Sequence, residues 1–136
     1  MPRLHVLAVS ARLPAWAEAA CADYAKRMPR GYELARVPLK NADLKGVPAK
    51  YRGSRIVALD ERGKDLTTVQ FSRLLASETA FVIGGADGLP EDFKKSASQV
   101  VRLSAMTLPH ALAQVLLIEQ LYRAATLLTG HPYHRG

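Results

Sequence analysis

Short apolar runs bounded by turn residues recur along this chain, and they limit its fold more strongly than any other feature of the sequence. The first run, Leu4–Ser10 (LHVLAVS), is apolar at nearly every position, which is typical of a strand buried on both faces. Four further runs are also predicted strands: Tyr32–Val37, Arg55–Asp60, Ala80–Ile83 and Val100–Leu103. Strands buried on both faces belong to parallel sheets, whose strands are joined by helical crossovers.

Helical patterns occupy much of the chain between these runs. The predicted helices are residues 14–28, beginning at Pro14; 67–76, capped by Thr67; a short helix from Pro90; and 111–129, ended by Gly130. Residues Glu61–Asp65 are predicted as a turn. Alternating strands and helices predict an α/β fold with a mainly parallel sheet flanked by helices, in a single domain over residues 1–136.

Spacing also predicts which side chains share a helix face. In the first helix one face carries Trp16, Ala20, Tyr24 and Met28. In the helix after Thr67 the predicted buried side is Phe71, Leu74 and Leu75.

The last predicted helix, residues 111–129, is apolar around most of its circumference. Its polar residues Glu119, Gln120 and Arg123 occupy a narrow arc, with Glu119 and Arg123 spaced for an i,i+4 ion pair. Together with Gln114, these polar residues make the stretch Ala111–Leu128 too polar for a membrane span. One sheet face cannot cover so wide an apolar surface, so we expect a second subunit, and deep burial within one subunit is the alternative.

Charge and cysteine content bear on partners and compartment. The formal net charge is +7, which favours anionic partners such as nucleic acid. Residues 40–55 hold five Lys and Arg against Asp43, and two interpretations stay open: a solvated loop or an RNA-phosphate contact surface. Cys21 is the only cysteine, so no intrachain disulfide can form and nothing indicates an oxidising compartment. We therefore expect an inert buried thiol in a cytoplasmic protein without a membrane segment.

Two loops and one terminal segment are the candidate functional elements. Ligands bind parallel sheets at the carboxyl ends of strands, which indicates the loops 84–88 (GGADG) and 104–109, each of which directly follows a predicted central strand. His110 is expected to cap or pack rather than to catalyse. The segment His131–Arg135 (HPYHR) concentrates groups that stack on bases, bind phosphate and move protons. We expect no metal, because His131 and His134 lack nearby acidic or thiol ligands.

Three motifs in order, FVIGGADGL, LSAMTLPH and HPYHR, carry a resemblance to a known family. The sequence resembles, almost end to end, the bacterial SPOUT-superfamily methyltransferases that modify N3 of a pseudouridine in 23S rRNA of the large ribosomal subunit. The resemblance implies a C-terminal deep trefoil knot, a homodimer and S-adenosyl-L-methionine (S-adenosylmethionine) as cofactor.

The resemblance also implies site residues. Cofactor-binding positions would be Leu59, Gly84, Gly85, Leu103, Ser104, Ala105, Met106, Thr107 and Leu108. Tyr133, His134 and Arg135 would be the catalytic group, facing the RNA and completing the partner subunit's cofactor site. His134 would take or orient the N3 proton while Arg135 fixes a phosphate or base oxygen.

Two departures from the family pattern stand out. Ser10 replaces a glycine that usually follows the first strand, and the segment between Pro38 and Arg55 is shorter than in many relatives. The second departure bears on RNA affinity more than on chemistry. Two other functions stay open, namely a non-catalytic dimeric RNA-binding or ribosome-assembly factor and a SPOUT methyltransferase with another RNA target.

Overall fold

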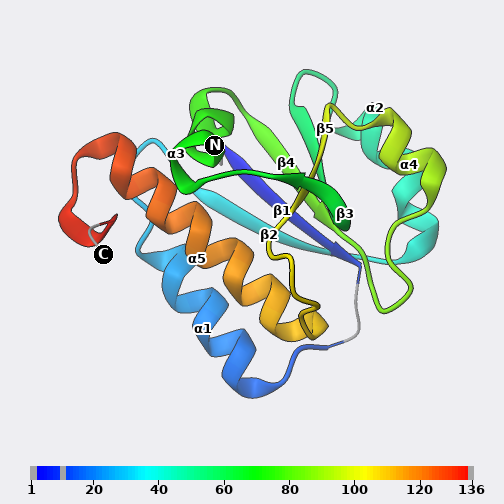
Figure 1. Ribbon diagram of the computed structural model, residues 1–136, viewed down its shortest axis with the longest axis horizontal. Helices are drawn as coiled ribbons and strands as arrows, with labels where there is room; N and C mark the ends of the chain where they lie inside the picture. Colours follow the sequence, from blue (N-terminus) through cyan, green and yellow to red (C-terminus); the bar gives the residue numbers. More distant parts are fainter. Residues whose placement is uncertain (1–2, 10–11, 135–136) are drawn as a thin grey trace.

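The computed structural model describes residues 3–9 and 12–134, with side chains up to Tyr133, and contains a five-stranded sheet. The strand order is β2-β1-β4-β3-β5, and every pairing is parallel. The strands are β1 (Leu4–Val9), β2 (Leu34–Leu39), β3 (Arg55–Asp65), β4 (Thr79–Ile83) and β5 (Gln99–Arg102). The predicted parallel α/β sheet is therefore confirmed, and β4 lies at its centre (Figure 1).

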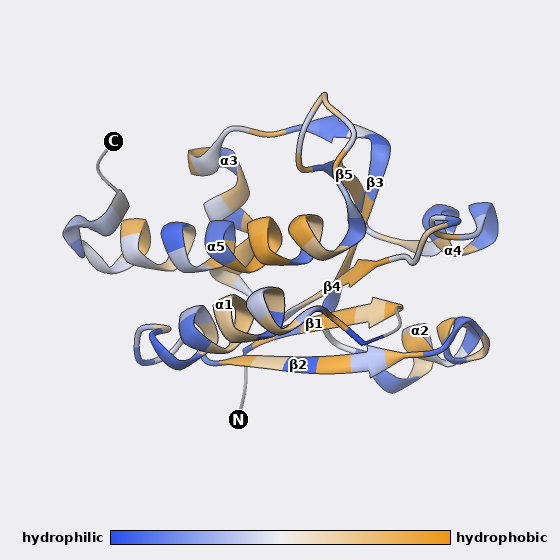
Figure 2. Ribbon diagram, turned by 90° about the horizontal axis from the view of Figure 1, so that it is seen from below, coloured by the Kyte–Doolittle hydropathy of each residue, from blue (hydrophilic) through white to orange (hydrophobic). Residues whose placement is uncertain are grey.

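Both faces of the sheet are covered by helices, which explains why the strand runs are continuously apolar. One core cluster joins one side of the strands to α1 (Ala15–Lys26), α3 (Thr68–Ser72), η2 (Arg73–Ala76) and α5 (His110–Thr129). A second cluster joins the other side to η1 (Asn41–Gly46), α2 (Val47–Lys50) and α4 (Glu91–Ser96). Figure 2 shows apolar residues along β1, β4 and α5, where these layers meet.

Local helix signals are confirmed where the sequence contained them. The Thr67 hydroxyl accepts a hydrogen bond from the Gln70 backbone N–H, and the Gln70 side chain accepts from the Thr67 N–H. Phe71, Leu74 and Leu75 are buried as predicted. Gly130 ends α5 with a φ of 78°, a left-handed conformation that glycine adopts without strain.

The first predicted helix face was partly wrong. Trp16 is 56% exposed, whereas Ala17 and Cys21 are buried against the core. Tyr24 and Met28 pack at the edge of the same cluster. The buried stripe is therefore shifted by one residue at its start, where Ala17 rather than Trp16 is buried. Burial also raises the pKa of the Cys21 thiol, as expected for an inert cysteine.

The predicted turn at Glu61–Asp65 was wrong, because β3 continues through it. Its pairing with β5 shifts register between Leu59 and Lys64, after which Lys64 pairs with Val101 and Asp65 with Arg102. Gly63 permits this irregularity, since a Cβ atom there would lie 2.6 Å from the carbonyl carbon of Val101. Pairing with the edge strand therefore overrides the local turn signal. It also corrects the expectation that loop 104–109 follows a central strand.

Residues 40–55 are not simply a loop. They form η1 and α2, and Leu44 and Val47 are buried against the second core cluster. Lys45, Lys50 and Arg52 remain exposed. The apolar residues of this segment cover the sheet while its basic residues face solvent.

Helix α5 is long and apolar enough, by length and composition alone, to cross a membrane, so its polar residues do not by themselves exclude a span. It instead packs against α1 and α3 within the fold, burying Leu117, Ile118 and Leu121 completely. The Arg123 guanidinium donates to Glu119 at 2.8 Å, confirming the i,i+4 pair. One subunit therefore buries much of α5, while Leu112 and Leu128 stay exposed. The knot and the second subunit remain predictions.

Candidate cofactor cavity and tail segment

A cavity of about 570 Å³ lies at the carboxyl ends of β4 and β5 and beside the middle of β3, where a parallel sheet is expected to bind ligands. The two predicted loops, 84–88 and 104–109, supply much of its wall together with residues 59–62 of β3 and the start of α5. Eight of the nine predicted cofactor positions line it: Leu59, Gly84, Gly85, Leu103, Ser104, Met106, Thr107 and Leu108. Ala105, the ninth, is exposed and is not part of the lining.

Loop 84–88 has a shape that requires glycine at two positions. The Gly88 N–H donates to the Gly85 carbonyl at 3.0 Å, and Gly88 has a φ of +74°. A Cβ atom on Gly84 would lie 2.6 Å from the carbonyl carbon of Gly88, so a side chain there would force the backbone apart. The tight turn holds main-chain amide and carbonyl groups at the cavity wall.

Loop 104–109 contributes small and apolar groups. The Ser104 hydroxyl accepts a hydrogen bond from the Met106 N–H at 2.9 Å, which fixes the start of the loop. Leu103 and Leu108 face the cavity, and Met106 lines it while remaining 79% exposed. With Leu59 and Ile83 on the strand side, the cavity has apolar walls suited to a flat ring system.

His110 begins α5 and connects the two loops. Its Nε2 lies 2.9 Å from the Gln114 amide nitrogen, and its ring also makes a hydrogen bond to the Gly84 backbone. Burial lowers the His110 pKa, and the Gly84 bond opposes this only in part. A neutral imidazole fits both contacts, with one nitrogen accepting from Gln114 and the other donating to the Gly84 carbonyl. These contacts agree with the packing role that the sequence predicted for His110. The structure shows in addition that His110 lines the cavity.

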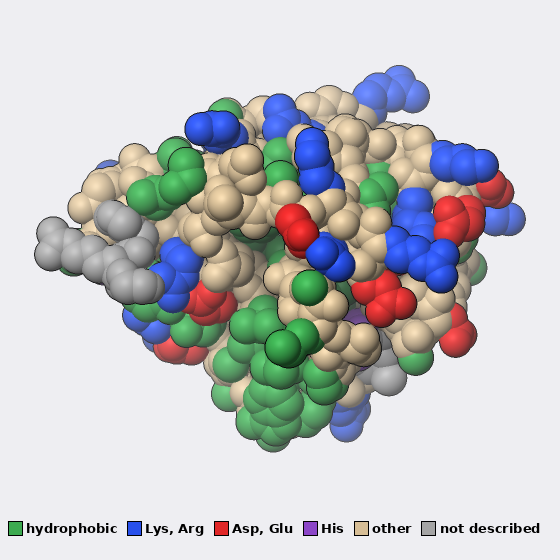
Figure 3. All heavy atoms as spheres, in the orientation of Figure 1, with side chains coloured by type: hydrophobic (Ala, Val, Ile, Leu, Met, Phe, Trp, Pro, Cys, Tyr) green, Lys and Arg blue, Asp and Glu red, His purple; other side chains and the backbone are tan. Residues whose placement is uncertain are grey.

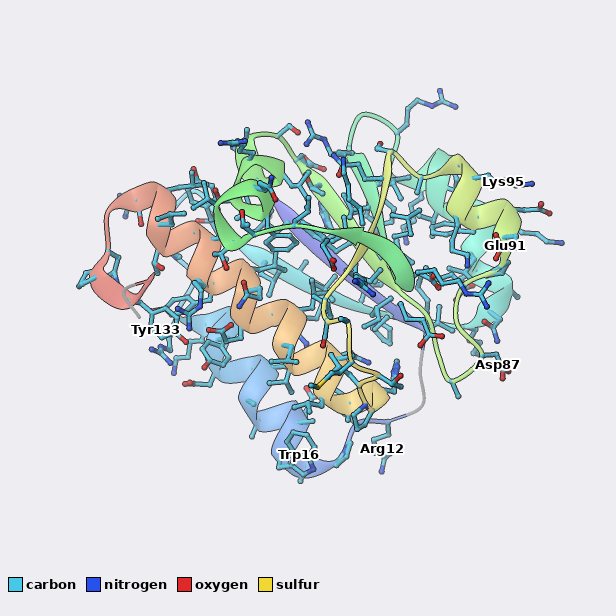
Figure 4. The ribbon with its side chains drawn as sticks, viewed as in Figure 1. Arg12, Trp16, Asp87, Glu91, Lys95 and Tyr133 are labelled. Atoms are coloured by element: carbon cyan, nitrogen blue, oxygen red, sulfur yellow. The ribbon has the colours of Figure 1, made fainter. Side chains whose placement is uncertain are left out.

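Acidic side chains outnumber basic ones around this cavity, although the whole protein is basic. The lining carboxylates are Asp60, Glu61, Asp87 and Glu91, and the lining cations are Arg62 and Lys94. Figure 4 shows Asp87 and Glu91 on the same side of the molecule, projecting from the loop and from α4. The Lys94 ammonium lies 3.4 Å from Asp60 and 2.9 Å from Glu91. The excess negative charge favours a ligand that carries positive charge.

Sequence reasoning missed several of these wall residues. Asp60, Lys94 and His110 line the cavity but were not predicted as binding residues. Asp60 ends the predicted strand RIVALD, and the last residue of a predicted buried strand is a candidate for the binding edge of a parallel sheet. Lys94 carried no such signal, because only folding brings α4 beside Asp60 of β3.

The tail segment is defined as residues 131–135, and its described backbone, residues 131–134, lies apart from this cavity. Tyr133 is in η3 (Pro132–His134) and contacts Glu119 and Tyr122 near the C-terminal half of α5. Figure 4 shows it across the molecule from Asp87. The His134 side chain and Arg135 lie outside the described residues. Of the predicted catalytic group, only Tyr133 is thus placed by its side chain, and it does not line the cavity. Within the described residues no cluster of three potential metal ligands occurs.

Comparison with known proteins gives consistent results over the full chain. Residues 2–134 match the model of the family described as predicted SPOUT methyltransferases. The "Ribosomal RNA large subunit methyltransferase H" of Janthinobacterium sp. (strain Marseille) is 43% identical over 154 residues, covering 98% of this chain and 99% of that protein. The protein of the same name from Polynucleobacter asymbioticus is 47% identical over 146 residues, with the same coverage.

Solved structures support the fold. The SpoU methyltransferase AviRb from Streptomyces viridochromogenes, determined with AdoMet, superposes with a TM-score of 0.55 at 16% identity, covering 93% of this chain and 60% of that one. The TrmH/SpoU tRNA modifying enzyme of A. aeolicus superposes with a TM-score of 0.59 at 12% identity, covering 96% and 79%. At such low identity these similarities concern the arrangement of strands and helices alone.

Proposed function

The chain belongs to the SPOUT methyltransferase family, and from that premise we propose that it transfers a methyl group from S-adenosylmethionine to ribosomal RNA of the large subunit. The observation that carries the proposal is the identity of 43–47% over 98% of the chain with proteins named ribosomal RNA large subunit methyltransferase H. As in the sequence-based expectation, the target is N3 of a pseudouridine in 23S rRNA.

The cavity fits S-adenosylmethionine in size and chemistry. Its volume of about 570 Å³ lies within the usual range for ligands of this size. Apolar walls at Leu59, Ile83 and Leu103 suit the adenine ring, and the main-chain groups of Gly84 and Gly85 can hydrogen-bond its edge. The lining carboxylates suit the positive charge of the sulfonium. When bound, the cofactor supplies a methyl group that a nucleophile can take by in-line displacement.

The residues of the protein would contribute mainly alignment and proton handling. The two loops would hold the methyl donor by backbone and apolar contacts, which fixes the approach line of the nucleophile. The imide nitrogen of the target base must lose its proton as it bonds to the methyl carbon, and His134 would receive or orient that proton. Arg135 would bind a phosphate or a base oxygen and hold the RNA in place.

The position of Tyr133 supports a homodimer in which one subunit's tail segment serves its partner's cavity. Tyr133 contacts α5 at Glu119, nine residues beyond His110, which corresponds to about 14 Å along the helix axis. His134 and Arg135 follow Tyr133 directly, and two residues of backbone span at most about 7 Å. The segment cannot easily reach the cavity of its own subunit. In a homodimer it would instead lie at the cavity of the partner subunit.

An exposed apolar surface near the cavity suits such a second subunit. Trp16 at the start of α1, Met106 in loop 104–109 and Leu112 at the start of α5 are 56%, 79% and 36% exposed. Figure 3 shows apolar side chains gathered over the N-terminal ends of α1 and α5. Isolated apolar residues on a surface are common, but apolar side chains gathered in one place favour a protein partner.

We infer a cytoplasmic enzyme with no metal and no membrane partner.

The exposed basic residues of η1, α2 and the turn after them suit RNA phosphates. Lys45, Lys50 and Arg52 face solvent while Leu44 and Val47 anchor the same segment to the core. A folded segment presents its charges at fixed positions, which favours the phosphate-contact interpretation over a solvated loop.

Methyl transfer to purified ribosomes tests the proposal directly. Cells lacking the protein should contain ribosomes that accept one radiolabelled methyl group from S-adenosylmethionine in its presence, in the large-subunit RNA. Nucleoside mass spectrometry of that RNA should find N3-methylpseudouridine restored. An unchanged nucleoside profile together with RNA binding would indicate the non-catalytic assembly factor, and methylation at another nucleoside would indicate another target.

A further inference from the structure

The tail segment is held against α5 by a cluster of polar and aromatic groups that the ion-pair pattern alone did not predict. The Tyr133 hydroxyl donates to Glu119 Oε2 at 2.9 Å, across 14 positions of sequence. The same carboxylate oxygen accepts from Arg123 Nε at 3.1 Å and Nη2 at 2.8 Å. One acceptor atom on α5 therefore joins the helix to the tail segment.

Aromatic packing holds the Tyr133 ring as well as its hydroxyl. Its centroid lies 4.6 Å from that of Tyr122 in an edge-to-face arrangement, and its hydroxyl oxygen lies 3.3 Å from that of Tyr24. The Arg123 guanidinium carbon lies 5.1 Å from the ring centroid. Helices α1 and α5 thus both contact the ring, so the position of the tail segment depends on how these two helices pack together.

The backbone entering Tyr133 is also fixed. Gly130 adopts the left-handed conformation, and the His131 N–H donates to the Thr126 carbonyl at 2.9 Å. The Tyr133 N–H donates to His131 Nδ1 at 3.2 Å. The chain thereby reverses after α5 and returns along the helix toward Glu119.

We propose that Glu119 is a positioning residue, which through the Tyr133 hydroxyl sets the location from which the tail segment reaches the partner's cavity. The inference rests on the proposed function and concerns how the same site is assembled. Glu119 does not line the cavity, and its side chain is only 14% exposed. A half-buried carboxylate whose oxygens accept hydrogen bonds from donors of its own subunit is suited to holding the segment rather than to contacting RNA.

The physical reason for such a device is the entropy of a terminal segment. Ordering a residue costs conformational entropy, and a free tail would incur that cost at the moment RNA binds. A hydrogen bond and ring contacts made within each subunit meet that cost before the RNA arrives, so turnover improves with little change in cofactor affinity.

A mutant cycle separates positioning from direct action. Glu119→Ala and Tyr133→Phe should each lower kcat for methyl transfer about tenfold or more. The double variant should be no worse than either, because each substitution removes the same hydrogen bond between Tyr133 and Glu119. Glu119→Gln should retain part of the activity, since its amide oxygen can still accept from Tyr133. The dissociation constant for S-adenosylmethionine should stay within about twofold of wild type in all of them. Tyr32→Phe, a tyrosine between α1 and β2, is the matched control.

A second readout needs no methyl transfer. Burial and the contacts with Tyr24 and Glu119 raise the Tyr133 pKa above that of an ordinary tyrosine. Alkaline titration by ultraviolet difference absorbance should find one late-ionising tyrosine, missing in Tyr133→Phe and shifted to lower pH in Glu119→Ala.

The outcomes distinguish this inference from the function it rests on. Multiplicative losses in the double variant, full activity of Glu119→Ala, or an unchanged titration in that variant would each overturn the positioning role. Wild-type protein that transfers no methyl group to ribosomes would overturn the proposed function, even with the titration as expected. If Glu119→Ala lowers the unfolding midpoint, Tyr24→Phe replaces it in the test. This variant removes a single hydroxyl and should give a smaller loss of kcat in the same direction.

Discussion

Gly84 lies so close to Gly88 that a Cβ atom on Gly84 would approach the carbonyl carbon of Gly88 to 2.6 Å. Gly84→Ala should therefore open the turn at the cavity wall, lower the free energy of unfolding by about 1–3 kcal/mol and weaken S-adenosylmethionine binding at least about tenfold. Calorimetric titration and chemical denaturation measure the two effects. Gly46→Ala is the control, because a Cβ atom there has no neighbour within 4 Å, and it should leave both values near wild type.

His110 should make stability depend on pH in the acid range. Because burial lowers its pKa below the ordinary 6.5, the unfolded chain binds a proton that the folded protein resists. The contribution is present above about pH 6.5 and is lost as the pH falls through the lowered value. The free energy of unfolding should thus fall more steeply between about pH 7 and pH 5 in wild type than in His110→Gln. Parallel curves for the two proteins would contradict this.

The tail segment should be needed for turnover rather than for cofactor binding. His134→Ala and Arg135→Ala should each reduce kcat for methyl transfer at least about a hundredfold, the usual scale for a lost proton-transfer or substrate-positioning group. Calorimetry with S-adenosylmethionine should give a dissociation constant near that of wild type. Full activity in both variants would refute the assignment.

The exposed lysines of η1 and α2 should act on RNA affinity. Lys45 and Lys50 changed together to Gln should raise KM for ribosomes and reduce the slope of affinity against salt by about two counterions. Replacement of Arg30 and Arg73 by Gln removes the same charge from exposed positions elsewhere, on the turn after α1 and on η2. If the two pairs behave alike, general charge rather than this segment attracts the RNA.

Sequence reasoning reached the sheet and most of the cavity because both depend on local patterns. Continuous apolar runs predict buried parallel strands, and the carboxyl ends of such strands locate loops 84–88 and 104–109. The predictions were wrong where contacts between residues distant in sequence determine the structure. Lys64 and Asp65 extend β3 because β5 is available to pair with them, and Trp16 is exposed while Ala17 and Cys21 occupy the buried positions of α1. Glu119 looked like half of a helical ion pair, since its contact with Tyr133 exists only after the chain reverses at Gly130.

The separation of Tyr133 from the cavity of its own subunit has a genetic consequence. In the proposed homodimer, a protein with Gly84→Ala still donates an intact tail segment, and a protein with His134→Ala still offers an intact cavity. Mixing the two impaired proteins should therefore raise activity above that of either alone, since each mixed dimer contains one complete site and one doubly defective site. Two recessive alleles of this kind should complement one another in the same cell, whereas either allele alone leaves the ribosomes undermethylated.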